Sequence, residues 1–297
     1  KLPAVWRGNL AVDRKLAFLD SNVSVEAIYT RIDRALFITN ENINPTTKGA
    51  DGRQRYAGNP STLANARYSA FTDLYRISNV RAGESAYFTL SWSRPMKNRW
   101  SFDASYTRGR STEAQAIGQT TAAGQWQRNV IFNQSVVEVG RSDFEVKDRV
   151  VISGSREFEF IKNAKTTVSL NYEGRTGNPF SWIYSNDLNN DGTSNDTVAV
   201  PSGLNDPRFD FSGLNATQQQ FYMDFMRTSG LAKYAGGVAP KNAFTQPWVN
   251  KLDLHVSQAV PLHFKTAQLE VFFDWTNFGS FLTRRLFNYY EEAFRQT

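Results

Sequence analysis

The sequence KLDLHVSQAV at residues 251–260 decides the fold class, because apolar and polar side chains alternate along it. Leu252, Leu254 and Val256 occupy every second position, with polar residues between them. A β-strand directs successive side chains to opposite faces, so this segment predicts a strand with one apolar and one polar face. The segment TAQLEVFFDWTNF at 266–278 repeats the pattern. Half-polar strands joined by alternately short and long connections are typical of a membrane β-barrel.

The same alternation recurs along the whole chain and defines its predicted organisation. We predict about eight strands, at residues 6–13, 22–39, 73–93, 99–108, 144–158, 165–174, 248–260 and 266–278. Short connections are predicted at 15–21, 95–98, 161–164 and 261–265, and long loops at about 40–69, 109–142 and 186–246. The expected fold class is all-β: an antiparallel transmembrane β-barrel with long extracellular loops, in which residues 1–297 form part of a single barrel domain.

One break in this pattern allows two interpretations. The residues RAGE at 81–84 interrupt the strand predicted at 73–93 and could form either a turn or a β-bulge. A turn at Gly83 would place the long loops on opposite rims of the barrel, whereas a bulge keeps them on one rim. We therefore predict a bulge.

Composition sets limits on the class of protein. The mean hydropathy of −0.48 is that of a water-soluble protein, but a barrel with a polar lumen and polar loops has the same value. No run of ~20 apolar residues predicts a transmembrane helix, and the 14% of aromatic residues suits barrel girdles. The absence of cysteine excludes disulfides and thiolate chemistry. The net charge of +6 is dispersed, which argues against nucleic-acid binding. The first residues are strand-like and contain no signal peptide, so we expect the chain to be part of a longer protein.

The sharpest local motif is DLNNDGTSND at 187–196, which matches the start of a calcium-binding loop. Calcium prefers several oxygen ligands at about 2.4 Å, and Gly192 supplies the turn of such a loop. The twelfth position is Val198, however, where an EF-hand has a bidentate glutamate. The alternative is a surface loop rich in Asx turns. The candidate ligands are Asp187, Asn189, Asp191, Asn195 and Asp196.

The loops contain two further candidate features. Residues 216–234 predict a helix that Gly230 ends, with Phe221, Phe225 and Met226 on one face, either covering the lumen or packing on neighbouring loops. Among the tryptophans we favour membrane-girdle anchoring, with sugar stacking by Trp182 and ligand contact by Tyr184 as the sharper alternative. The tryptophans considered are Trp92, Trp100, Trp182, Trp248 and Trp275.

Polar residues predicted to point into the lumen do not form a catalytic pattern. His255 is expected near Asp253 in a salt-bridge network, and His263 in a turn; no serine elbow or carboxylate pair accompanies them. We therefore expect no enzymatic activity and no required cofactor. On the strand at 144–158, the residues expected outward are Phe144, Val146, Val150 and Ile152, and those expected inward are Glu145, Lys147, Arg149 and Ser153. The other inward charges are expected at Asp253, Glu270 and Asp274.

Several phrases of the chain resemble the barrel of the Oar-like TonB-dependent outer-membrane receptors. They are TGNPFSW at 176–182, DLNNDG at 187–192, GLAKYAG at 230–236, NAFTQPWVNKLDLHVSQ at 242–258 and FFDWTNFG at 272–279. The resemblance is strong from about 144 to 279, looser before that, and poor over 282–297.

This resemblance implies an arc of a barrel of about 22 strands, in the outer membrane of a Gram-negative bacterium. The plug domain, the TonB box and the final strands would lie outside the chain. The implied function is uptake of a scarce external solute, such as a peptide, an oligosaccharide or a metal chelate, driven by the inner-membrane TonB complex. Implied partners are outer-membrane lipid and, in some systems, an accessory surface lipoprotein. The rivals are a structural or adhesive barrel and a secreted soluble β-protein that acts on carbohydrate.

Overall fold

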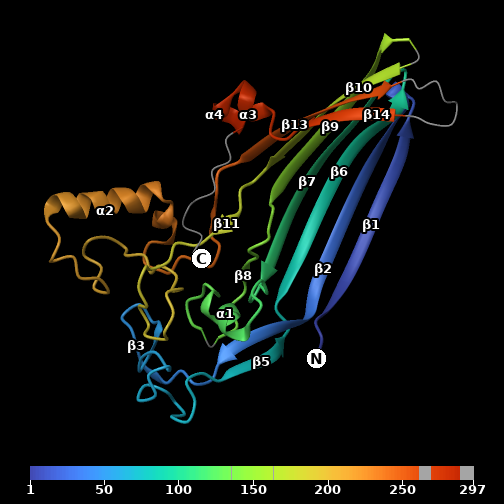
Figure 1. The fold of residues 1–297 in the computed structure, drawn as a ribbon. Helices are drawn as coiled ribbons and strands as arrows, with labels where there is room; N and C mark the ends of the chain where they lie inside the picture. Colours follow the sequence, from blue (N-terminus) through green and yellow to red (C-terminus); the bar gives the residue numbers. More distant parts are fainter. Residues whose placement is uncertain (135, 163, 261–268, 288–297) are drawn as a thin grey trace.

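The computed structural model describes residues 1–134, 136–162, 164–260 and 269–287, and most of its strands form one antiparallel sheet (Figure 1). The main path of the sheet is β1-β2-β6-β7-β9-β10-β13-β14, so each strand pairs with its predecessor and successor along the path. The bounds are β1 Ala4–Leu16, β2 Ser21–Asn40, β6 Gly83–Lys97, β7 Trp100–Glu113, β9 Asp148–Ile161, β10 Ala164–Arg175, β13 Val249–Val260 and β14 Leu269–Trp275. In the described part of the chain β1 and β14 are not paired with each other, so the sheet is an open arc. The prediction of about eight antiparallel strands is confirmed.

The register of the strands gathers their apolar side chains on one face. One cross-strand row, for example, runs through Val12, Val25, Leu90, Tyr106 and Val150. These side chains have no protein core to pack against, and Val12 and Leu90 are 63% and 44% exposed. A soluble sheet would bury this face, whereas a membrane barrel turns it to lipid.

The opposite face of the sheet is polar and carries ion pairs between neighbouring strands. Arg149 Nε lies 2.9 Å from Glu173 Oε1, and His255 Nδ1 lies 2.6 Å from Asp274 Oδ1. His255 therefore lies on the polar face, as predicted, and its partner is Asp274 on the neighbouring strand. Asp253 instead pairs with Lys251 at 2.9 Å, on its own strand.

The short turns lie at one end of the sheet, and two of them are displaced from their predicted positions. β1 continues to Leu16 and the chain reverses at a 3-10 turn, Phe18–Asp20, not over 15–21. β6 continues through Pro95 to Lys97, and the reversal uses Asn98 and Arg99, both with positive φ. Two consecutive left-handed residues form the type I′ turn that matches the twist of a hairpin. The predicted turn at 261–265, with His263, lies outside the described residues.

Arg94 joins two of these short turns. Its side chain is 4% exposed, and its guanidinium donates to the carbonyls of Leu19, Lys97 and Trp100 while it lies 3.8 Å from the centre of the Trp100 ring. An arginine in this position satisfies main-chain carbonyls that the turns leave unpaired.

We predicted a bulge and not a turn at 81–84. The structure has no turn there, but it has no bulge either. β5, Tyr75–Val80, and β6 both pair with β2, and the pairs Ala35–Val80 and Arg31–Glu84 belong to one register with no added residue. Gly83 has φ +114, and a Cβ there would lie 2.5 Å from the carbonyl oxygen of Thr112. Glycine therefore permits a close approach of the backbones while the strand direction continues.

The strand predicted from Phe144 begins only at Asp148, which corrects the facing of its first residues. Phe144 is exposed in a loop, whereas Glu145 is 3% exposed and therefore is not a lumen-wall residue. The Oε2 atom of Glu145 accepts the N–H of Ser111, and Oε1 pairs with Arg141 at 2.8 Å.

The long connections contain small elements of their own. Their bounds are β3 Pro45–Lys48, β4 Gln54–Tyr56, α1 Ala122–Gln127, β8 Gly140–Arg141, β11 Pro179–Phe180, α2 Ala216–Thr228, β12 Phe244–Thr245, α3 Gly279–Leu282 and α4 Arg284–Phe287. None of the helices in the described ranges is long and apolar enough to cross a membrane.

The helix predicted at 216–234 is present but shorter. α2 begins with a capping box between Asn215 and Gln218, ends at Thr228, and is followed by Gly230 at φ +81 and a 3-10 turn, Leu231–Tyr234. Met226 is buried as the aromatic stripe predicts, but Phe221 is 74% exposed.

Candidate functional site

Three long connections, residues 41–74, 114–147 and 176–248, gather at the end of the sheet opposite the short turns (Figure 1). We call them the loop unit. They follow β2, β7 and β10, which run in the same direction, so the topology alone places them on one rim. This arrangement agrees with the predicted long loops at 40–69, 109–142 and 186–246.

A buried arginine holds the three connections together. Arg53, on the first connection, is 1% exposed, and its Nη1 lies 2.8 Å from Asp196 Oδ1 on the third. The same nitrogen donates to the carbonyl of Phe132 on the second connection at 3.2 Å, and the guanidinium stacks on the Phe132 ring at 4.4 Å. Nη2 donates to the carbonyl of Thr197, and Nε pairs with Asp51 at 3.2 Å. A single side chain therefore contacts all three connections of the loop unit.

Main-chain bonds reinforce this junction. The N–H of Tyr56 donates to the carbonyl of Asn189 at 2.8 Å, and the N–H of Gln54 donates to Asn133 Oδ1 at 3.0 Å. Asn195 Nδ2 donates to the carbonyl of Gln127 at 2.9 Å. The connections are therefore hydrogen-bonded to one another and do not behave as separate loops.

The buried apolar clusters of the described residues lie in the loop unit and at the strand ends next to it. One cluster contains Ile38, Ile43, Tyr56 and Trp126, and another contains Val200, Met226, Leu231 and Ala239. Of the buried apolar side chains in the described residues, only Ala164 lies at the short-turn end of the sheet. The loop unit is thus a folded body, and we expect it to present a rigid surface.

Both aromatic residues proposed for ligand contact lie inside this body. The ring of Trp182 makes edge contacts with Phe180 at 5.7 Å and Phe225 at 5.4 Å, and packs on the second apolar cluster. Its assignment to the membrane girdle is wrong, and its aromatic contacts favour a core role over sugar stacking. Tyr184 donates its hydroxyl to the carbonyl of Ala199 at 3.3 Å, and burial raises the pKa of its phenol.

The candidate calcium loop is a compact turn in which its own side chains accept main-chain N–H groups. Asp187 accepts the N–H groups of Asp191 at 3.1 Å and Gly192 at 2.8 Å, and Gly192 has φ +94. Asn189 Oδ1 accepts the N–H of Asp191 at 2.9 Å. Asp196 Oδ2 accepts the N–H of Leu188 at 2.9 Å, which closes the loop on itself.

Two observations bear on whether this loop fits a cation. Asp191 is fully buried with neutral hydrogen-bond partners, Asn189 and Thr193, and burial raises its pKa to about 7. Asn195 Oδ1 is buried and has no hydrogen-bond partner in the described part of the chain. One observation argues against a preformed metal site: no group of three acidic or histidine side chains in the described ranges is arranged to hold a metal ion. Calcium at Asp187, Asn189, Asp191, Asn195 and Asp196 stays a prediction.

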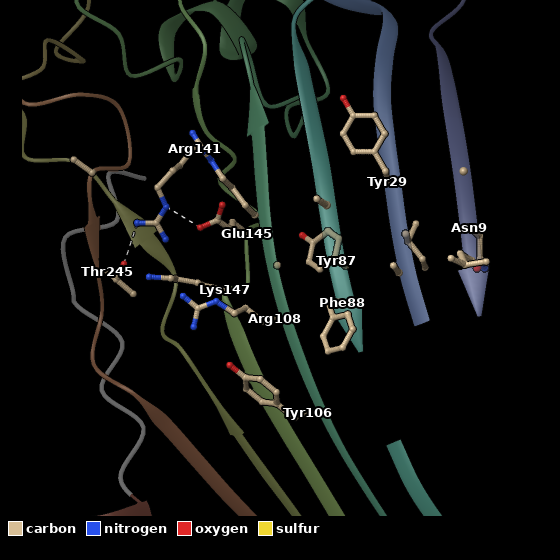
Figure 2. Close-up of a pocket in the computed structure, with 18 residues that line it drawn as sticks. Asn9, Tyr29, Tyr87, Phe88, Tyr106, Arg108, Arg141, Glu145, Lys147 and Thr245 are labelled. Atoms are coloured by element: carbon tan, nitrogen blue, oxygen red, sulfur yellow. Dashed lines mark hydrogen bonds and ion pairs between the residues drawn. The ribbon is translucent and has the colours of Figure 1, made fainter. Parts of the chain in front are cut away.

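A cavity of about 1420 Å³ lies between the loop unit and the strand wall (Figure 2). Its wall is centred on one cross-strand row of the polar face, Asn9, Ile28, Tyr87 and Gly109. The strand neighbours of these residues and Tyr106 also line it, and alternation places their side chains on the other face of the sheet. From the loop unit it is lined by Arg141, Glu145, Lys147, Ala243 and Thr245.

The geometry of this cavity depends on Tyr87 and Gly109. The two residues are paired across β6 and β7, and a Cβ on Gly109 would lie 2.1 Å from the Tyr87 ring. The glycine therefore allows the ring to lie flat against the wall, which keeps the cavity open. Opposite the ring, Arg141 pairs with Glu145 and donates to Thr245 Oγ1 at 3.0 Å (Figure 2).

Sequence reasoning missed this site. Alternation placed Glu145 on a strand, and Tyr87 and Arg141 carry no motif. Only the pairing of β6 with β7 and the return of the third connection bring them together. The long connections after alternate strands are the one signal that pointed to this end of the sheet.

The comparisons agree with the apolar outer face and polar inner face of the sheet. Residues 1–281 match the family described as Outer membrane beta barrel domain, and the chain belongs to that family. It is therefore a protein of the Gram-negative outer membrane, in contact with outer-membrane lipid. No curated protein and no solved structure matched the chain.

Proposed function

We propose that the chain is part of a TonB-dependent receptor that takes up a scarce external solute, namely a peptide, an oligosaccharide or a metal chelate. The observation that carries the proposal is the cavity of about 1420 Å³ between a folded loop unit and the polar face of the wall. Ligand sites of proteins are concave and largely preformed, and this cavity is larger than the usual 300–1,000 Å³. Its position between the external loops and the lumen suits a solute on its way to the periplasm.

The loop unit supports the same proposal. Arg53 contacts all three connections, and one apolar cluster joins the first connection to the second, so a ligand bound by one connection would act on all three. The Oar-like resemblance of 176–182 and 242–258, at the beginning and the end of the third connection, adds the expectation of TonB coupling. No covalent or redox step is proposed, and no cofactor is required for uptake.

The experiment is a binding assay between the full-length protein and the purified periplasmic domain of TonB. The receptor proposal expects specific binding, which is lost when the N-terminal box of the full-length protein is deleted. A protein that reaches the outer membrane but does not bind the TonB domain would overturn the proposal. Adding the accessory lipoprotein, if one copurifies, extends the same assay to that partner.

The second candidate is an adhesive barrel without transport. One observation favours it: Phe221, on helix α2, is 74% exposed and lines an apolar depression together with Leu214 and Tyr222. An adhesive barrel would bind its target without TonB and would lose binding on Phe221→Ser. The third alternative, a secreted soluble protein, is wrong because the chain belongs to an outer-membrane family.

A further inference from the structure

Three tyrosines mark a line across the apolar face of the sheet, near the loop unit. Tyr29 donates its hydroxyl to Glu84 Oε2 at 2.7 Å. Tyr106 donates to Asp148 Oδ1 at 2.6 Å, and Tyr172 donates to Asn250 Oδ1 at 2.7 Å.

All three bonds have the same direction. The register places Glu84 opposite Arg31, Asp148 opposite Arg108 and Asn250 opposite Gly174, each two residues beyond its tyrosine toward the loop unit. Amphipathic aromatic residues of this kind concentrate at the membrane surface. The line therefore marks the boundary between hydrocarbon and head groups of the outer leaflet.

Arginines lie directly beyond this line on the same, lipid-exposed face. Arg31 is paired with Trp6 and Glu84, Arg108 with Phe88, and Arg110 with Ala86. The side chain of Arg108 is 60% exposed and pairs with Asp148 at 3.2 Å. Arg31 and Arg110 are exposed and have no carboxylate within ion-pair distance in the described part of the chain.

We propose that Arg31, Arg108 and Arg110 bind phosphate groups of the glycolipid that forms the outer leaflet. A charged side chain on the lipid face of a barrel is costly unless an anionic head group neutralises it. The planar guanidinium binds phosphate oxygens in a bidentate fashion. Arg108 and Arg110 are two residues apart on one strand, about 7 Å. Arg31 is two strands away, and the register places it opposite Glu84 and Thr112, so its Cα lies about 12 Å from that of Arg110 and about 17 Å from that of Arg108. Long arginine side chains on these three positions can reach the two phosphates of one lipid head group.

The apolar neighbours of these arginines identify the lipid, not free phosphate, as the occupant. Arg108 shares its cross-strand row with Phe88 and Leu10, which are 46% and 71% exposed. A molecule bound here meets cationic groups above the tyrosine line and a hydrocarbon surface below it. A phosphorylated, acylated lipid has both parts, whereas inorganic phosphate has only one.

The test uses native mass spectrometry of the full-length protein in detergent, with added lipid A that carries two phosphates or none. The triple variant Arg31→Gln, Arg108→Gln, Arg110→Gln is compared with the control triple Arg7→Gln, Arg149→Gln, Arg175→Gln. The control residues lie on the polar face, where Arg7 donates to Thr30 and Arg149 pairs with Glu173.

We expect the wild type and the control to retain phosphorylated lipid A preferentially, and the first triple to lose at least about tenfold in retention. Equal retention of both lipids by the wild type would overturn the proposal, even if the variant does not fold. Equal retention by the two triple variants would also overturn it. Competition by inorganic phosphate as efficient as by phosphorylated lipid A would show a free-anion site and reject the lipid.

Discussion

Arg53 Nη1 lies 2.8 Å from Asp196 Oδ1, and both side chains are 1% exposed, although 143 positions separate the two residues in the sequence. A buried charge pair of this kind contributes through the penalty for breaking it, because the remaining charge would stay buried without a partner. The order of the loop unit therefore depends on one guanidinium.

Replacing Arg53 with methionine should open the loop unit while leaving the sheet inserted. Loss of one partner of a buried pair costs about 3–5 kcal/mol. Hydrogen exchange over 41–74, 114–147 and 176–248 should increase, and exchange over the strands should not. The control is Arg76→Met, because Arg76 is 66% exposed and its pair with Glu41 contributes less than about 1 kcal/mol. Unchanged exchange in Arg53→Met would contradict the role given to Arg53.

Replacing Leu254 with arginine should impair membrane assembly. Leu254 lies on the apolar face, paired with Leu170 and Trp275, and a cation there costs about 2–4 kcal/mol near the bilayer centre. Heat-modifiability on gels measures the folded fraction in outer membranes. The matched control is His255→Arg, the next residue on the opposite face, which places an arginine opposite Asp274. Ser257 on the same face is a poorer control, since it is only 4% exposed. Equal assembly of Leu254→Arg and His255→Arg would contradict the assignment of Leu254 to the lipid face.

Replacing Gly109 with alanine should displace the Tyr87 ring and reduce the cavity. The added methyl would lie 2.1 Å from the ring, and overpacking of this kind costs about 1–3 kcal/mol. The thermal midpoint of the folded barrel should fall. Gly154→Ala is the control, because the nearest atom to its Cβ would be 3.9 Å away. A midpoint as high as that of the control would show that the ring is not held against Gly109.

Replacing Asp187 and Asp191 with alanine should abolish any calcium effect on the loop unit. If calcium binds, millimolar calcium should protect residues 176–248 of the wild type from proteolysis and should not protect the double variant. Asp210→Ala is the control, since Asp210 lies outside the motif and only accepts the N–H of Ser212. If calcium does not protect the wild type from proteolysis, the prediction of a calcium site at 187–196 is wrong.

The stability of the loop unit should fall as the pH rises from about 4 to about 7. Burial raises the pKa of Asp191 from 3.8 to about 7, so in this range the folded state retains a proton that the unfolded chain has released. The free energy of unfolding then decreases by up to about 1.4 kcal/mol per pH unit from this group, and is constant above the folded pKa.

Hydrogen exchange between pH 4.5 and 8.5 (about the range in which the group titrates) measures this trend, after correction for the intrinsic exchange rate. Asp191→Asn mimics the protonated side chain and should remove the slope. A slope that persists in Asp191→Asn must come from another group. Added calcium, which requires the ionised carboxylate, should reverse the trend in the wild type.

The sequence was sufficient for features that depend on neighbours in the chain. Alternation at 251–260 predicted a strand with the correct apolar face, and the positions of the long connections predicted one rim. Prediction from the sequence failed where contacts with residues distant in the chain determine the position of a side chain. Glu145 continued the alternation of 148–158 but is drawn away by Arg141 and Ser111. Trp182 was placed at the membrane because two of the aromatic rings that pack on it, Phe225 and Phe244, come from distant segments.

The candidate site shows the same limit more clearly. Asp187 and Asp191 were found because a motif of adjacent residues carries them, and the structure brings them together in one loop. Arg53 gave no signal, since an arginine followed by QRY has no pattern that distinguishes a buried residue from an exposed one. Tyr87 and Gly109 are ordinary strand residues until β6 and β7 are aligned.

The order of the strands has a consequence for the time course of assembly. Each strand of the main path pairs with its neighbours, so hairpins can enter the membrane one after another as the chain is delivered. Arg53 lies between β2 and β6, whereas Asp196 lies between β10 and β13. Their contact can form only after every intervening strand has been placed. The external surface is therefore completed last, and a barrel arrested midway would reach the membrane without it.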